Sequence, residues 1–175
     1  SLTNDFRKAL EAMDGMLFPD HPYGTQTVLG TQEHLKNPSI TNIKNYQKTY
    51  YVPNNIAICL SGDFDPDEMV AVIEKYFGQM QPNKDLPEIT LATSSVIESP
   101  VEKDVYGLDA ENIMIGWKYP GAKSEDALVA EVAASVLYNG SAGLIDLNIN
   151  QQQTVLEADG MSYSRPDAGE LILMG

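Results

Sequence analysis

Two short apolar runs, each followed by a well-capped helix, set the strongest limit on the fold of this chain. The first run is NIAICLS at residues 55–61, and the second is NIMIGWKY at residues 112–119. Runs of this length and composition are typical of buried strands. Asn55 and Asn112, which open the two runs, lie 57 residues apart. The chain therefore either repeats one strand-helix unit or holds two units that merely look alike, and both alternatives predict a fold that combines strands and helices.

Capping signals indicate where the helices after these runs begin. Asp65 is a strong N-cap, Pro66 suits the first helical position, and Glu68 completes the spacing of a capping box. Ser124 is expected to cap the second helix, and Gly78 to end the first in the left-handed conformation. Periodicity predicts that each helix buries one apolar face, formed by Met69, Val70, Ile73, Tyr76 and Phe77 in the first and by Leu128, Val129, Val132, Val136 and Leu137 in the second.

Further elements follow from the same signals. Phe6, Leu10, Met13 and Leu17 form one stripe of a helix that starts near Thr3 and leads into a loop at residues 18–31. The other expected elements are a helix capped by Ser39 or Thr41 and stopped by Pro53, a linker with some extended pairing at residues 79–103, a short helix from Ser141 to Asn148 or Asn150, and strands at residues 154–163 and 169–174.

Charge and cysteine content exclude several classes of protein. The 175 residues carry a formal net charge of -14, which would repel nucleic acid and anionic membrane surfaces. No apolar run approaches the roughly 18 residues of a membrane-spanning helix. Cys59 is the single cysteine, so an intramolecular disulfide and a thiolate-rich metal site are excluded, and its apolar run predicts a buried, inert thiol. The 43% of hydrophobic residues fits a globular protein.

Motifs for metal binding and nucleophilic catalysis are incomplete. Asp63, Asp65, Asp67 and Glu74 copy the spacing of a calcium loop, but Glu68 stands where such a loop needs glycine. Ser141 directly follows a glycine and continues into a helix, so it is interpreted as part of a helix cap and not as a nucleophile.

The two histidines, His21 and His34, do not complete a zinc motif. The segment from Gly30 to Glu33 and His34 would read H-x-x-E-H only if residue 30 were histidine. His21 is interpreted as a surface or hydrogen-bonded loop residue. From their chemistry alone, the residues of this chain name no active site.

The order of several short segments resembles a known family. These are HPYG at residues 21–24, LGT at 29–31, YYVPNN at 50–55, SGDFDP at 61–66 and YFG at 76–78. In this order they resemble the insulinase/pitrilysin-type zinc metallopeptidases, also called inverzincins, which include mitochondrial processing peptidase-like proteins. The resemblance covers nearly the whole chain and favours duplicated units over chance likeness.

The resemblance implies an α+β fold with an antiparallel or mixed sheet and helices packed on one face, as in LuxS and the processing peptidases, with both units incomplete. Residues 1–80 would be the C-terminal half of a first unit, 81–104 a linker, and 105–175 the N-terminal half of a second, homologous unit. Both ends are expected to be truncated, so that the chain is an internal fragment. The family's H-x-x-E-H would precede Ser1, and its glutamate ligand would fall at or just before that residue. Glu11 is a poor substitute, and His21 keeps only the structural role of its loop. No catalytic, cofactor or metal residue is therefore assigned.

Two functions remain open. In the first, the parent protein is a zinc-dependent metalloendopeptidase, a hydrolase active in proteolysis, and this segment forms structural and substrate-chamber wall without hydrolysing peptides or binding zinc itself. In the second, the parent has lost its zinc ligands and is a scaffold or substrate-binding subunit. Expected partners are an unfolded peptide or protein substrate, the missing flanking parts, and a homo- or hetero-dimer mate. A soluble protein without a targeting segment is expected, in a compartment that the sequence leaves open.

Overall fold

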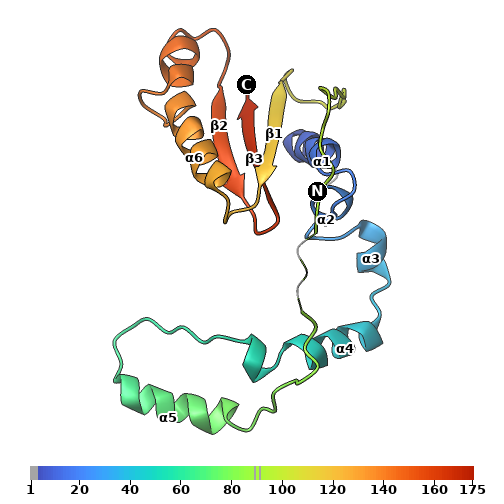
Figure 1. The fold of residues 1–175 in the computed structure, drawn as a ribbon, viewed down its shortest axis with the longest axis vertical. Coiled ribbons are helices and arrows are strands. Elements are labelled where there is room, and N and C mark those ends of the chain that lie inside the picture. Colours follow the sequence, from blue (N-terminus) through green and yellow to red (C-terminus); the bar gives the residue numbers. More distant parts are fainter. Residues whose placement is uncertain (1–3, 89, 91) are drawn as a thin grey trace. The chain divides into compact units, whose positions relative to one another are not determined.

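The computed structural model describes residues 4–88, 90 and 92–175, and their contacts divide them into two parts (Figure 1). The first part joins residues up to Leu29 with those that follow Leu91, and the second holds residues from Gly30 to Thr90. Within the first part, the Asp5 carboxylate accepts hydrogen bonds from the backbone N–H groups of Leu108 and Asp109. These two parts are not the two homologous units that the sequence predicts. The division of the chain into units at residues 1–80 and 105–175, joined by a linker at 81–104, stays a prediction.

The first part is built on a three-stranded antiparallel sheet with strand order β1-β3-β2. Residues Trp117 and Leu171 pair between β1 and β3, and Met161 pairs with Ile172 between β2 and β3. All three strands were predicted; the bounds of the first and third are within two residues, but the strand expected at residues 154–163 begins only at Asp159. The elements of this part are α1 (Asp5–Leu17), α2 (Pro22–Thr25), β1 (Met114–Pro120), α6 (Glu125–Leu137), a π-helical turn (Asp146–Asn150), β2 (Asp159–Ser164) and β3 (Ala168–Met174).

Helix α1 covers one face of the sheet and forms the core there. Gly116 in β1 allows the close approach, since a Cβ atom at this position would lie 2.8 Å from Met13 Sδ and 2.9 Å from Leu17 Cδ1. The predicted stripe of α1 is thus confirmed at the two residues that enter the core. The buried cluster consists of Met13, Leu17, Phe18, Ala168 and Ile172.

Helix α6 packs on the sheet through alanines. Ala127, Ala130 and Ala134 are its buried residues, and Ser124 caps its first turn as predicted. A Cβ atom added at Gly160 would contact Leu173 and also Tyr138, which directly follows α6. Gly160 and its pairing partner Leu173 lie on the face of the sheet opposite α1. Helices therefore lie on both faces in this part, whereas the resemblance implied one, because β3 carries apolar side chains on both of its faces.

The predicted inner face of α6 is wrong. Leu128, Val129, Val132 and Val136 are each more than half exposed, and Leu137, the fifth residue of that face, is half-buried. The alanine stripe lies toward the sheet because small side chains let the helix axis come close, and the larger residues are left on the outside. Hydrophobicity ranked these residues correctly as apolar but did not decide which apolar stripe meets the sheet.

Ala130→Leu is therefore expected to lower the free energy of unfolding by about 1–3 kcal/mol, since the added atoms must enter the contact with the sheet. Val132→Ser, on the outer face of the same helix, is expected to change it by less than about 0.5 kcal/mol. Urea unfolding followed by circular dichroism measures both. Equal losses in the two variants would contradict the orientation of α6.

The second part contains α3 (Gln32–Lys36), α4 (Ile40–Tyr50), a 3₁₀ turn (Pro53–Asn55) and α5 (Pro66–Phe77). The predicted caps are confirmed, because Ser39 Oγ accepts from the N–H of Asn42 and the Asp65 carboxylate from Asp67 and Glu68. Gly78 is right-handed at φ -61°, since its N–H bonds to the Glu74 carbonyl and continues the helical pattern. The expected left-handed end of α5 is thus wrong.

Residues 55–61 do not form the predicted strand. A strand is stable when a neighbour pairs with its backbone groups, and no strand lies among residues 30–88 and 90 to do so. Ile56, Ile58 and Leu60 are exposed, and Cys59 is exposed where a buried thiol was expected. The predicted buried face of α5 is wrong at Val70, Tyr76 and Phe77, which are exposed, whereas its other two residues, Met69 and Ile73, are half-buried.

Candidate functional site

His21 is a buried residue that caps a helix in a segment predicted as loop. Pro22 begins the short helix α2, and His21 Nδ1 accepts a hydrogen bond of 3.1 Å from the backbone N–H of Tyr23. Because Nδ1 is the acceptor, Nε2 carries the ring proton, and it lies 3.3 Å from Asp167 Oδ2. Asp167 also accepts from the N–H of Ala92. His21 has 1% of its surface exposed, and its Nε2 makes no hydrogen bond to the described residues, so packing places it between α2 and the turn that joins β2 and β3.

Arg165 lies at the centre of the same region. Its guanidinium stacks on the ring of Tyr23 at 4.2 Å and lies 5.3 Å from the ring centre of Phe18. One nitrogen, Nη2, contacts Asp14 Oδ1 at 3.4 Å and also Glu170 Oε1. These contacts join α1, α2, β3 and the turn before β3. We call this group the Arg165 cluster; it consists of Asp14, His21, Tyr23, Arg165, Asp167 and Glu170.

A cavity of about 740 Å³ opens beside the Arg165 cluster. Asp14, Tyr23 and Arg165 belong to both the cluster and the cavity wall. Arg7 and Glu11, which also line the cavity, form an ion pair of 2.9 Å on the exposed side of α1. The cavity therefore gives water a path to the edge of the cluster.

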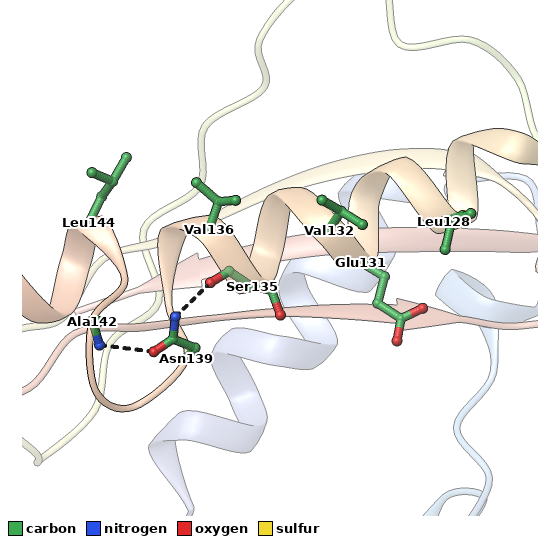
Figure 2. A pocket seen from close by; sticks show the side chains of 8 residues that line it. All are labelled: Leu128, Glu131, Val132, Ser135, Val136, Asn139, Ala142 and Leu144. Atoms are coloured by element: carbon green, nitrogen blue, oxygen red, sulfur yellow. Dashed lines mark hydrogen bonds between the residues drawn. The ribbon is translucent and has the colours of Figure 1, made fainter.

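A second, open cavity of about 610 Å³ lies along α6 (Figure 2). Figure 2 shows Leu128, Val132, Val136 and Leu144 in a row on one side, with Glu131 as the charged residue of the lining. Asn139 also lines this cavity; its Oδ1 accepts from the N–H of Ala142 and its Nδ2 donates to the Ser135 carbonyl. This lining suits contact with another apolar surface better than it suits catalysis.

The described residues do not fit a zinc ion. The acceptor nitrogen of His21 already binds a backbone N–H, and His34 Nδ1 accepts from the N–H of Thr31 in the capping box of α3. Across residues 4–88, 90 and 92–175, no group of three or more His, Cys, Asp or Glu side chains is placed to hold a metal ion. Asp65 caps α5, and Ser141 donates its N–H to Asn139 Oδ1 in a loop that becomes helical only at residue 144.

The chain matches the profile of the Peptidase M16 inactive domain over residues 39–171. It belongs to this family. The resemblance to insulinase/pitrilysin-type peptidases is thereby confirmed, as is the antiparallel α+β character of the fold. Among relatives, an uncharacterized zinc protease of Mycobacterium leprae is 27% identical over 150 residues, which are 85% of this chain and 32% of that protein. The chain thus spans about a third of that relative's length.

Two solved structures share the fold of this family member. A protease from Helicobacter pylori superposes with a TM-score of 0.71 at 18% identity, over 97% of this chain and 45% of that one. A chain in complex III2 from Candida albicans, bound to Inz-5, gives a TM-score of 0.73 at 20% identity, over 98% and 42% of the two chains. Within the described residues of this M16 chain, no helix has the length and apolar character needed to cross a membrane.

The Arg165 cluster is the part of the site that sequence reasoning missed. Residues 165–168 were interpreted only as a connection between two strands. One signal was available, because Glu170 is the single charged residue in the apolar strand AGELILM. A charged residue in such a strand is rarely buried without a partner, so it indicates a buried ion pair.

Proposed function

We propose that this chain is a non-catalytic part of a zinc-dependent metalloendopeptidase, in which it forms structural and substrate-chamber wall. The match of residues 39–171 to the M16 inactive domain carries this proposal. The name of the Mycobacterium leprae relative, a zinc protease, supports a parent that hydrolyses peptide bonds. An unfolded peptide or protein would be its substrate.

The zinc ion would be held by residues outside this chain, since the described donors do not fit it. When bound in such a peptidase, zinc activates a water molecule for attack on the scissile carbonyl. The contribution of this chain is the sheet and helices that support the chamber.

The outer face of α6 supports a larger parent assembly. Leu128, Val132 and Val136 expose a continuous apolar row that a protein in water normally covers. We assign this covering to flanking parts of the same parent protein.

A second candidate is a scaffold or substrate-binding subunit whose parent has lost its zinc ligands. The likeness to a chain of complex III2 favours this alternative, because in that complex the same fold occurs within an assembly. A homo- or hetero-dimer would then supply the partner.

Metal analysis and peptide cleavage test the proposal directly. The 175-residue chain is expected to bind well below one zinc per molecule and to show no cleavage of unfolded peptides that a chelator abolishes. A stoichiometric zinc with chelator-sensitive cleavage in this chain would overturn its non-catalytic assignment. The same assays on the longer parent separate the two candidates, since zinc-dependent cleavage is expected only for the peptidase.

A further inference from the structure

Two carboxylates in the Arg165 cluster compete for one cation. Asp14 Oδ1 and Glu170 Oε1 both contact Nη2 of Arg165. The Glu170 side chain is 4% exposed, and its second oxygen, Oε2, is buried without a hydrogen-bond partner, as is Arg165 Nε. A single guanidinium neutralises one of the two carboxylates, so ionising both would leave an uncompensated negative charge in a buried place.

Other charged groups around Glu170 do not relieve this imbalance. Lys118 pairs with Glu170 across β1 and β3, but its Nζ bonds to Ser94 Oγ and to the Ser95 carbonyl. His21 directs its Nε2 to Asp167 and not to Glu170. The titratable or charged groups that face this region are Asp14 from α1, Asp20 and His21 from the following loop, Tyr23 from α2, Lys118 from β1, Tyr163 from β2, and Arg165 and Asp167 from the β2–β3 turn.

A bound proton is the remaining way to balance the charges. Burial, and then the negative charge of Asp14, raise the pKa of Glu170 from its usual 4.5 to about 7, while Arg165 opposes the rise. Near neutral pH Glu170 therefore gains and loses a proton, and the cavity beside Asp14 and Arg165 gives water a path to this group of charges.

We propose that a proton on Glu170, next to Asp14 at the Arg165 guanidinium, fastens α1 and α2 to the sheet, so that this N-terminal segment loosens when the proton is lost. Asp14 belongs to α1 and Glu170 to β3, so the charge balance at Arg165 acts on two elements that are far apart in the sequence. Its loss sets two carboxylates against each other at that contact. This inference concerns regulation of the fold and does not depend on the peptidase assignment.

The direction of the pH effect follows from the raised pKa. A carboxyl that titrates at higher pH in the folded state stabilises that state at low pH, and this stabilisation is lost as the pH rises through the folded-state value. The contribution is thus complete below about pH 4.5 and has disappeared above about pH 7. Most paired carboxylates have the opposite effect, because they lose their stabilisation as the pH falls.

Hydrogen exchange of the 175-residue chain, read by mass spectrometry between about pH 5 and pH 8, tests the proposal. The fraction of molecules in which the amides of α1 and α2 are open to exchange is expected to rise roughly 10- to 70-fold across this range, relative to the same fraction for α6. The comparison with α6 in the same sample cancels the intrinsic pH dependence of exchange, and α6 packs on the other face of the sheet.

Variants identify the groups involved. Glu170→Gln is expected to abolish most of the relative change, because it removes the titrating carboxyl. Asp14→Asn is expected to reduce the change only in part, because burial, the first cause of the raised pKa of Glu170, remains. Glu11→Gln removes an exposed carboxyl from the same helix, outside the pair, and is expected to keep the wild-type profile. A wild-type ratio that does not change with pH would overturn the proposal even if a variant failed to fold. A Glu170→Gln profile equal to that of the wild type would also overturn it.

Discussion

Gly24→Ala is expected to cost about 3 kcal/mol of unfolding free energy. A Cβ atom at this position would lie 2.2 Å from the Phe18 carbonyl oxygen and 2.5 Å from that of Asp14. Both oxygens belong to the backbone where α1 ends and turns toward α2, so they cannot move aside as a flexible side chain would. Urea unfolding at constant pH, followed by far-ultraviolet circular dichroism, measures the loss.

Gly15→Ala is the matched control for this prediction. Gly15 lies inside α1, and the nearest atom to an added Cβ is the Gly24 carbonyl oxygen at 3.7 Å, an ordinary contact. Alanine favours the helix over glycine by about 1 kcal/mol, so this variant is expected to be more stable than the wild type. If Gly24→Ala were tolerated as well as Gly15→Ala, the close packing of α1 against α2 would be disproved.

Phe18→Ala is expected to lower the free energy of unfolding by about 3–5 kcal/mol. Phe18 is fully buried in the core between α1 and the sheet. Its ring also lies beneath two cations, with Arg165 5.3 Å and Lys118 5.8 Å from the ring centre. Truncation thus opens a cavity and removes the apolar surface on which the Arg165 cluster rests. Thermal and urea unfolding should both register the change.

Phe6→Ala provides the comparison, since Phe6 lies in α1 and Phe18 directly follows that helix as its C-cap. The Phe6 side chain is 47% exposed, and its truncation is expected to cost less than about 1 kcal/mol. A similar loss in both variants would mean that Phe18 is not the central residue of this core.

Local signals in the sequence predicted most of the elements. The capping residues Ser39, Asp65 and Ser124 each accept the expected backbone hydrogen bond, because a cap depends only on residues two or three positions away. The local patterns at residues 112–119, 154–163 and 169–174 also predicted β1, β2 and β3, and these segments pair with one another in the sheet. For the caps, the determining interaction lies within one segment.

Features that depend on distant partners were not predicted. The apolar run at residues 55–61 has the composition of a strand, but a strand also needs a neighbour, and composition does not supply one. Helix α6 has two apolar stripes, and only its packing on the sheet decides that the alanine stripe is the buried one. The Arg165 cluster brings together residues near 14–23 and near 165–170, and no spacing within either segment indicates the other.

The first part is formed by two segments that are separated in the sequence by residues 30–90, and this has a consequence for biosynthesis. Helix α1 finds its apolar partner, Ile172 in β3, only after the whole intervening polypeptide has left the ribosome. At 5–20 residues per second, translation leaves the Met13 and Leu17 side chains without their native cover for roughly ten to thirty seconds. During that interval the nascent chain is a natural client for chaperones that bind exposed apolar helices, and slower translation would lengthen its dependence on them.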